Sequence, residues 1–537
     1  MVSMARMTIW LFRSNGVTPK DVRGPLIFQK MPWLWRNCGR QPFHCAMLTV
    51  PKLYFSFISQ RCLSLSLRTK KMITEQAILP GLPLPKGQTR GSLVLQRGPA
   101  KAEREDNKLK LDDRAAHQWY RFVLSFPPHL VREYIAKFGL NSHHQVLDPF
   151  CGTGTTVVEC KKLGIPAFGL ESNPVACFAS QTKLQWDIDP QKLLRHALKV
   201  AETANRRLEQ DGFFDDDTYR LLERPVGANG KLRALPDEVA DLLLTNSISP
   251  IPLHKTLILL ETLAENHDDR FSNHERLALA TALVNEISNL HFGPEVGVGP
   301  AKSDAPVVSL WLDGVRAMAQ DLGNLPKTKT EKAVIYQADA RDGAPMLPAN
   351  SVDAVITSPP YPNEKDYTRT TRLEAVLLGF IQSKQNLRDL KKQMVRSNTR
   401  GVYKADTDDL LVAGHPQIES IAAAIEKRRI ELNKDSGFER LYARVTKLYF
   451  GGMARHLAGL RRVLRPGAQL AYVVGDQASY LRVMIRTGQL LASIAESLGY
   501  EVVGLDLFRT RLATATKEQL REEVVILRWP GGKCGKK

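Results

Sequence analysis

The chain has 537 residues, of which 43% are hydrophobic and 24% are charged, a balance that excludes wholesale disorder. It contains no run of about 18 apolar residues without a charge, so we expect no membrane-spanning segment. Lys and Arg exceed Asp and Glu by 19, which favours a polyanionic partner such as nucleic acid. Seven cysteines in so long a chain make no disulfide framework, and because none of them forms a CxxC pair, a zinc ribbon is excluded too.

Residues 1–71 form a basic leader, with twelve Lys and Arg against a single acid, Asp21, and they supply 11 of the 19 surplus charges. An acid-poor leader bearing Arg and Ser is typical of an organelle transit peptide. Alternatively, the natural chain starts at Met72 and the preceding stretch is translated upstream sequence. A nucleic-acid-binding arm is a third interpretation. The rest of the chain is bacterial in type, so we expect a cytoplasmic protein.

Residues 72–115 are a linker rich in Pro, Gly and charge, and residues 116–530 are expected to form one domain before a short basic tail, 531–537. Within that domain, two apolar runs, 145–150 and 165–171, each end in an acid and enclose an amphipathic stretch. This βαβ pattern predicts a parallel sheet that binds ligands at the carboxyl ends of its strands.

Two insertions are predicted to interrupt the domain, one mostly helical at about 190–330 and one charged and helical at about 381–437. A long helix is expected over 440–464, leading through Arg-Pro-Gly-Ala to the next strand. The remaining strands are expected at 333–339, 352–358, 469–476, 500–508 and 522–529, the last two as an antiparallel hairpin. The prediction is therefore an α/β domain with a seven-stranded, mostly parallel sheet.

The segment Asp148-Pro-Phe-Cys-Gly-Thr-Gly-Thr155 follows the first strand and opens a helix. Its two glycines allow a tight turn and a close approach to a ligand. A P-loop requires a Lys that is absent here, and a dinucleotide fingerprint requires a third Gly where Val157 stands. The remaining option is a nucleoside cofactor without a pyrophosphate, namely S-adenosylmethionine. Glu171 ends the next strand, where a carboxylate can accept both ribose hydroxyls.

The segment Ile356-Thr-Ser-Pro-Pro-Tyr361 directly follows another predicted strand. Two consecutive prolines fix the backbone and lack N–H donors, so the neighbouring carbonyls point outward in a rigid arrangement. A serine hydroxyl, those carbonyls and a tyrosine ring suit the grip of a flat heterocycle that carries an exocyclic amine.

Together, the two segments resemble the amino-methyltransferase family, which methylates exocyclic amines of bases in DNA. The resemblance covers roughly residues 117–180 and 333–530 and implies a Rossmann-like class I methyltransferase fold. The Thr-Ser-Pro-Pro-Tyr form is most similar to the cytosine-N4 branch. By matching position, the resemblance assigns the following residues. Phe126 and Pro127 cover the methionine end of the cofactor; Asp148, Phe150, Gly152, Gly154 and Thr155 form the cofactor loop; Glu171 binds the ribose; Asp339 contacts the adenine amine; and Ser358, Pro359, Pro360 and Tyr361 are the catalytic tetrad.

The implied activity is site-specific methylation of cytosine N4 in DNA, within a restriction-modification system, by direct transfer to a flipped base. Adenine-N6 methylation, RNA base methylation and nucleic-acid binding without turnover remain alternatives. Tyr367, Arg369 and Arg372 either contact the nucleic acid or form an exposed helix face. The loops 291–306 and 396–406 are interpreted as nucleic-acid contacts or as solvated linkers. Cys151 is expected to be a packing residue, and no metal site is expected.

Overall fold

The computed structural model describes residues 109–532, except 123–124, 216–231, 293–294, 327–331, 364 and 513–517. All of these residues belong to one compact unit, Gly91–Lys537. The predicted leader, most of the predicted linker and most of the predicted basic tail lie outside the described residues. No helix in the described ranges is long and apolar enough to cross a membrane.

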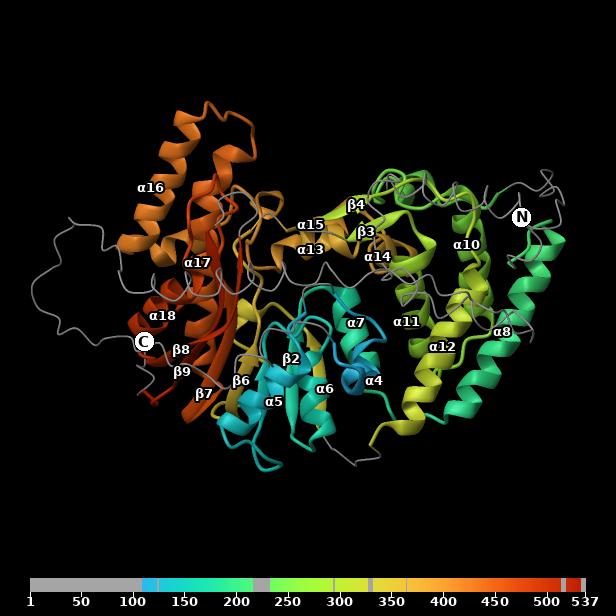
Figure 1. Cartoon of the computed structure of the whole chain (residues 1–537), viewed down its shortest axis with the longest axis horizontal. Coiled ribbons are helices and arrows are strands. Elements are labelled where there is room, and N and C mark those ends of the chain that lie inside the picture. The colour runs from blue at the N-terminus through green and yellow to red at the C-terminus, as the bar shows by residue number, and fades with distance from the viewer. Residues whose placement is uncertain are drawn as a thin grey trace, which may run out of the picture. The chain divides into compact units, whose positions relative to one another are not determined.

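A seven-stranded sheet organises the structure, with the strand order β5-β2-β1-β6-β7-β9-β8 (Figure 1). The strands from β5 to β7 pair in parallel, and β9 runs antiparallel to both of its neighbours. The predicted fold class, a Rossmann-like α/β sheet that is mostly parallel, is confirmed. The strands are β1 (Val146–Asp148), β2 (Ala167–Glu171), β5 (Ala333–Gln337), β6 (Val352–Thr357), β7 (Leu464–Gly475), β8 (Glu501–Leu512) and β9 (Gln519–Arg528).

The central strands are apolar on both faces because helices cover the sheet on both sides. Successive residues therefore point into two different hydrophobic cores. Val146 belongs to one core and its neighbour Leu147 to the other, and both are fully buried. Because β1 pairs with β6 directly, Leu147 lies opposite Val355 and the ends of these two strands share one edge of the sheet.

Helices follow or flank these strands, and two of them, α6 (Thr155–Lys162) and α17 (Tyr442–Leu460), fall where the sequence predicts an amphipathic stretch and a long helix. Thr155–Lys162, the predicted amphipathic stretch, is α6, and all of its first six residues are buried. The helices outside the insertions are α4 (Arg114–His117), α5 (Pro128–Lys137), α6 (Thr155–Lys162), α7 (Pro174–Thr182), α13 (Tyr367–Thr370), α14 (Arg372–Leu377), α17 (Tyr442–Leu460) and α18 (Thr487–Ser497).

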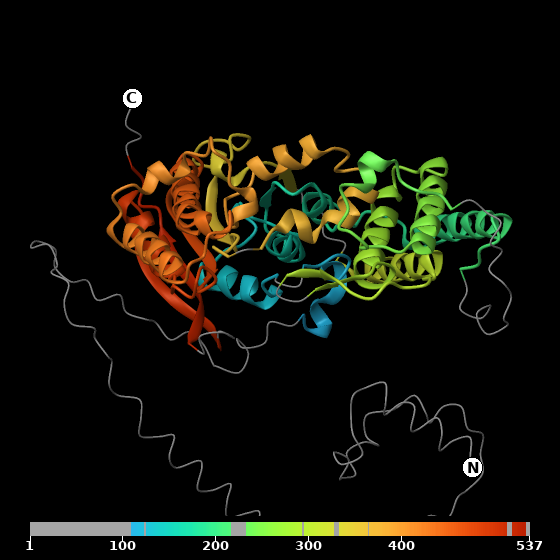
Figure 2. The same ribbon diagram turned by 90° about the horizontal axis from the view of Figure 1, so that it is seen from above.

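The first insertion is mostly helical, as predicted, and its long helices stand together at one end of the described structure in both views (Figures 1 and 2). One expectation was wrong, because the loop 291–306 contributes to a small antiparallel hairpin. Gly297 permits that pairing, since a Cβ there would lie 2.5 Å from the ring of His291. The elements are α8 (Pro190–Gln210), α9 (Asp237–Ala240), α10 (Pro250–Glu265), α11 (Ser272–Ala282), η5 (Leu283–Ile287), β3 (Leu290–Phe292), β4 (Val296–Val298) and α12 (Val307–Asn324).

The second insertion is also helical, as predicted, and comprises α15 (Lys384–Lys392) and α16 (Pro416–Glu431) joined by short 3₁₀ turns. The long helix that follows ends at Leu460, and Arg-Pro-Gly-Ala lies inside β7 instead of preceding it. Gly467 makes this possible, because its φ of +90° is available to glycine and its N–H donates to the Trp529 carbonyl at 2.7 Å.

Candidate active site

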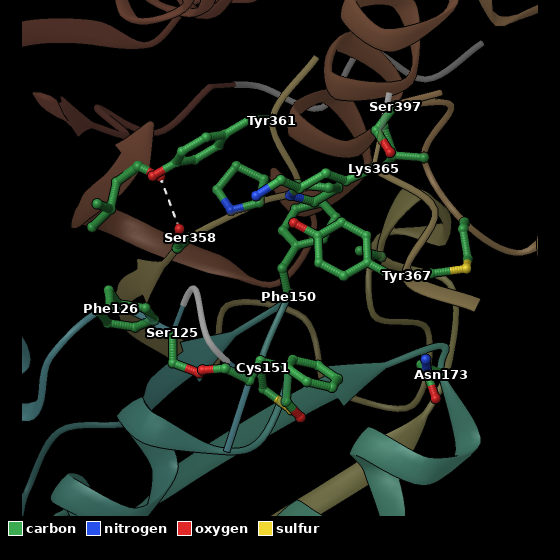
Figure 3. Close-up of a pocket in the computed structure, with 18 of the residues that line it drawn as sticks. Ser125, Phe126, Phe150, Cys151, Asn173, Ser358, Tyr361, Lys365, Tyr367 and Ser397 are labelled. Atoms are coloured by element: carbon green, nitrogen blue, oxygen red, sulfur yellow. Dashed lines mark hydrogen bonds between the residues drawn. The ribbon is translucent and has the colours of Figure 1, made fainter. Parts of the chain in front are cut away.

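A cavity of about 500 Å³ opens at the carboxyl ends of β1, β2, β6 and β7. Both sequence motifs line it, although more than 200 residues separate them along the chain, and Figure 3 shows Phe150 and Cys151 below Ser358 and Tyr361. Parallel β1 and β6 end at the same edge of the sheet, which is where a ligand site is expected in this architecture. The structure therefore brings the two predicted motifs into one site.

Gly152 and Gly154 turn the loop between β1 and α6 through positive φ values of +51° and +87°. A Cβ at Gly154 would lie 2.8 Å from the Ser180 Cβ, so only glycine fits there. Asp148 shapes this loop from behind and does not line the cavity. Its fully buried carboxylate accepts the Thr357 hydroxyl at 2.6 Å and the Phe150 N–H at 3.2 Å, while burial raises its pKa to about 6.

The loop and the tetrad strand are cross-linked by two side-chain hydrogen bonds. In addition to the bond from Thr357 to Asp148, the Thr156 hydroxyl at the start of α6 donates to the Ile356 carbonyl at 3.1 Å. All four of these side chains or carbonyls belong to residues that are at least 99% buried. The two motifs are thus fixed to each other by buried contacts as well as by the β1–β6 pairing.

Glu171, at the end of β2, lines the cavity and holds the loop in place. Its two carboxylate oxygens accept the backbone N–H groups of Gly152 at 2.8 Å and Asn173 at 2.7 Å. Burial raises the pKa of this carboxyl to about 7, and the two backbone donors oppose that shift. Each carboxylate oxygen retains a lone pair for a bound hydroxyl.

The Ser358 hydroxyl, directly after β6, donates to the Val473 carbonyl of β7 at 3.1 Å (Figure 3). Its proton is therefore engaged. The Tyr361 hydroxyl lies within hydrogen-bond reach of the Ser358 oxygen, which has two lone pairs and so keeps one to accept a hydrogen bond from the cavity side. The Tyr361 ring stands beside it over Gly475, the last residue of β7, where a Cβ would lie 2.9 Å from the ring. Burial and the nearby Glu522 carboxylate raise the pKa of the Tyr361 hydroxyl, which stays neutral.

Comparisons with known proteins agree with this arrangement. A family model described as N6_N4_Mtase, DNA methylase, matches residues 85–182, which include the cofactor loop. The Type II methyltransferase M.BsoBI of Geobacillus stearothermophilus is 25% identical over 78% of this chain and 84% of its own length. The Type II methyltransferase M.AvaI of a Nostoc strain is 24% identical over 77% of this chain and 86% of its own.

These comparisons support the N4/N6 DNA amino-methyltransferase family for this chain. Among solved structures, TrmN from Thermus thermophilus matches 75% of this chain and 48% of its own length at 10% identity, with a TM-score of 0.22.

The cofactor of this DNA methyltransferase is S-adenosylmethionine, and the residues present fit it. Gly152 lines the cavity without a side chain, and the Glu171 carboxylate faces the cavity with lone pairs available. Gly154 does not line the cavity, because it packs against Ser180 of α7. Phe126, Phe150 and Thr155, which the resemblance assigns to the cofactor, also line the cavity. Pro127 does not, because it is buried as the residue that precedes α5.

Asp339, two residues after the end of β5, lines the cavity, but its carboxylate is already engaged. Arg341, which the sequence analysis missed, donates to both carboxylate oxygens, with Nη2 at 2.6 Å and Nε at 3.0 Å. The same guanidinium bonds Asp408 of the second insertion at 2.8 Å. Asp339 can contact a cofactor only as one member of this ion-pair network.

The three residues after the tetrad have different environments. Tyr367 lines the cavity. Arg369 is half-buried, and its positive charge acts on the nearby Glu295 carboxylate, whose pKa it lowers against the effect of burial. Arg372 was predicted as a substrate contact or an exposed residue, and neither holds. Its guanidinium is 9% exposed and donates to the carbonyls of Thr368 and Leu242, so it ties α14 to the first insertion.

Both insertions reach the cavity through loops that the sequence analysis singled out. Glu295, next to β4, and Ser397 line it. Arg396 was a candidate nucleic-acid contact within the loop 396–406, but it is 4% exposed and paired with Asp406 at 2.8 Å. Its role is to hold that loop closed.

Further lining residues carried no motif and were missed. Asn173 alone left a signal, because Asn before Pro174 is a typical helix cap, and its side chain accepts the Val175 N–H at 3.0 Å. The missed lining residues with polar or charged side chains are Ser125, Ser172, Asn173, Asn363, Lys365, Gln393, Gln477, Ser479, Arg509, Arg511 and Glu522. Within the described ranges, no cluster of three or more His, Cys, Asp or Glu could hold a metal ion.

Proposed function

We propose that this protein is a site-specific DNA methyltransferase that transfers the methyl group of S-adenosylmethionine to the N4 amine of cytosine. The observation that carries the proposal is Ser358, whose proton is donated to the Val473 carbonyl while its oxygen faces the cavity beside Tyr361. A hydroxyl held in this way accepts a hydrogen bond from an amine. The serine at this position is also what distinguishes the cytosine-N4 form of the motif in the resemblance.

Bound S-adenosylmethionine supplies an electrophilic methyl group on a sulfonium. The residues of this chain position the acceptor. A flipped base stacks on the neutral Tyr361 ring, and its amine donates to the Ser358 oxygen and to the Pro359 carbonyl. Those two acceptors draw the nitrogen lone pair out of conjugation and aim it at the methyl group. Positioning and fixed dipoles then provide the rate acceleration without a covalent enzyme intermediate.

The roles proposed for the cofactor residues follow from the same geometry. Gly152 lets the backbone approach the cofactor, Gly154 allows the loop to turn against Ser180, Glu171 accepts the ribose hydroxyls, and Phe126 with Phe150 covers the apolar faces of the cofactor. Cys151 contributes no nucleophile to this proposal. Its thiol is 3% exposed, and burial together with the Glu171 and Asp148 carboxylates raises its pKa well above the usual value.

The test is a methylation assay on the whole protein with labelled cofactor and, in separate reactions, duplex DNA and structured RNA. Digestion to nucleosides and mass analysis identify the product, and sequencing of methylated plasmid DNA maps the site. N4-methylcytosine in DNA at a defined sequence supports the proposal. N6-methyladenine contradicts the cytosine assignment, and label in RNA alone contradicts DNA as the substrate.

Replacing Ser358 tests the mechanism in the same assay. We expect Ser358→Ala to lower kcat by about 100-fold with unchanged cofactor affinity, because an acceptor of the amine is lost. Ser497→Ala, an exposed serine at the end of α18, is the matched control and retains full activity. Unchanged methylation by Ser358→Ala contradicts the role given to the tetrad.

The Type II relatives further suggest that the enzyme protects DNA against a companion endonuclease.

A further inference from the structure

The β8–β9 hairpin places a charged pair on the cavity wall beside Tyr361. Arg509 of β8 donates to Glu522 of β9 through two parallel bonds, Nε to Oε2 at 2.6 Å and Nη2 to Oε1 at 3.0 Å. Both residues line the cavity, and Glu522 is 8% exposed. A planar guanidinium held by a two-point contact keeps one orientation, unlike a flexible ammonium.

Glu522 of this pair lies beside the proposed catalytic tyrosine, because it is paired with Gly475 across the β7–β9 ladder. A Cβ at Gly475 would lie 2.9 Å from Tyr361 Cε2 and 3.4 Å from Glu522 Cγ, so the two side chains meet over that glycine. The Arg509 guanidinium also lies 5.9 Å from the centroid of the Phe508 ring, which lines the cavity as well. Arg509 is therefore fixed next to the position where a stacked base would lie.

The guanidinium can donate where an amino base accepts. The guanidinium carries five N–H groups, and Nε and Nη2 each donate one of them to Glu522. Among the residues that the structure describes, the N–H groups of Nη1 remain available to a bound group. An amino base has a ring acceptor beside its amine, N3 in cytosine and N1 in adenine. A keto base has an N–H at that position, which would oppose a fixed cationic donor.

We propose that Arg509, oriented by Glu522, determines specificity by donating a hydrogen bond to the ring nitrogen beside the target amine. This inference rests on the proposed function, because it requires an amino base in the pocket. Arg509 would touch the substrate, whereas Glu522 is a positioning residue. Lys365 and Arg511 are other cations that line the cavity. The flexible chain of Lys365 lacks the two-point anchor that fixes Arg509, and Arg511 approaches Glu522 only through its Nε, at 3.5 Å.

The experiment compares a duplex bearing the mapped target cytosine with one bearing 3-deazacytosine, in which a C–H replaces the ring nitrogen. For the unaltered enzyme we expect the replacement to lower kcat/KM by about 10- to 100-fold, the range for a lost hydrogen bond to a charged donor. In Arg509→Lys, which keeps the charge but loses the fork, the same replacement should cost less than about threefold. The ratio of kcat/KM on the two duplexes is compared between the unaltered enzyme and the variant, so the analogue's own effect on reactivity cancels.

Glu522→Gln is a second variant that keeps the side-chain shape, and it should reduce the penalty for 3-deazacytosine to an intermediate value. Arg528→Gln is the matched control, because this exposed arginine of the same hairpin pairs only with Glu501 at 3.4 Å among its described contacts. It should retain the full penalty. Cofactor affinity and Tm, measured for each variant, show whether the pocket is intact.

The inference is overturned if Arg509→Lys and Glu522→Gln retain the full penalty, or if Lys365→Met abolishes it. These outcomes are distinct from failure of the proposed function. If the product is N6-methyladenine, the cytosine assignment fails, and the same comparison with 1-deazaadenine tests Arg509. If no methylated nucleoside forms on DNA, the proposed function fails and this inference fails with it.

Discussion

At the scale of single residues, Gly475 controls where the Tyr361 ring stands. We expect Gly475→Ala to lower kcat by at least about tenfold, because the added Cβ would lie 2.9 Å from the ring and must displace it. Cofactor affinity should stay unchanged, since the cofactor loop lies on other strands. Steady-state kinetics and calorimetric titration of the cofactor measure the two effects separately.

The matched control is Gly504→Ala in β8, where a new Cβ meets no atom within 4 Å. This variant should retain the kinetics of the unaltered enzyme. Equal losses in both variants would show that the sheet, and not the position of the tyrosine, is sensitive to the added methyl group.

Glu171 should make cofactor binding depend on pH near neutrality. Its pKa is raised to about 7 by burial, so the carboxylate that accepts ribose hydroxyls is present above that pH and is lost below it. We expect the Kd for S-adenosylmethionine to rise as the pH falls below 7, by no more than about tenfold per pH unit. Titrations across this range measure it.

Glu171→Gln should weaken binding and remove the pH dependence at the same time. Asp148, whose pKa burial raises to about 6, is the competing source of a pH effect. A dependence that survives in Glu171→Gln with a midpoint near 6 would assign the effect to Asp148 instead.

At the scale of structural elements, Lys183 joins two walls of the cavity. This residue follows α7, is 1% exposed, and donates to the Thr153 carbonyl of the cofactor loop at 2.9 Å. It also donates to the Tyr120 carbonyl, in the segment that leads to Phe126. Burial lowers the pKa of this lysine to about 7. One buried amine therefore sets the spacing of both segments.

We expect Lys183→Met to raise the Kd for S-adenosylmethionine by about tenfold or more, because two buried carbonyls lose their donor. Lys183→Arg should restore part of the affinity. Lys192→Met serves as the control, since that lysine is exposed on α8. Unchanged affinity in a folded Lys183→Met protein would show that the walls are held by other contacts.

The sequence predicted the elements whose signals are local. Apolar runs and capping residues located all seven strands of the main sheet to within a few residues. The β3–β4 hairpin escaped because its pairing depends on Gly297 clearing the ring of His291, a contact that no periodicity records. The start of β7 was missed for a similar reason, since Arg-Pro-Gly is normally a turn signal and Gly467 joins the strand through its bond to Trp529.

The site divides in the same way. The two motifs located the cofactor loop and the tetrad, because each is a short continuous segment that directly follows a strand. Arg509 and Glu522 lie on strands that meet only after folding, so their contact with the cavity has no local signal. Arg341 lies two residues after Asp339, but its second partner, Asp408, is distant in the sequence. Arg372 was misread because burial depends on the first insertion, whose Leu242 carbonyl it binds.

At the scale of the whole molecule, the charge is unevenly distributed along the chain. The leader 1–71 provides 11 of the 19 surplus charges. We expect the full chain to bind non-specific duplex DNA with a steeper dependence of log K on log salt than residues 72–537 do, by about 0.9 for each phosphate that the leader neutralises. Fluorescence anisotropy at several salt concentrations measures both slopes.

The two proteins should nevertheless share one Kd for S-adenosylmethionine, because the described residues that line the cavity lie between Phe122 and Glu522. Identical salt slopes would mean that the leader's charges do not contact DNA. A lower cofactor affinity in the shorter protein would give residues 1–71 a part in building the pocket.

The adjacency of β1 and β6, reinforced by the bonds from Thr156 to Ile356 and from Thr357 to Asp148, has a mechanical meaning. The reaction distance is set by the width of one strand pair and needs no hinge to close it. The insertions at about 190–330 and 381–437 lie outside this strand pair, so changes in their length need not move the cofactor loop and the tetrad apart. The relative position of the two motifs is set by the backbone of β1 and β6.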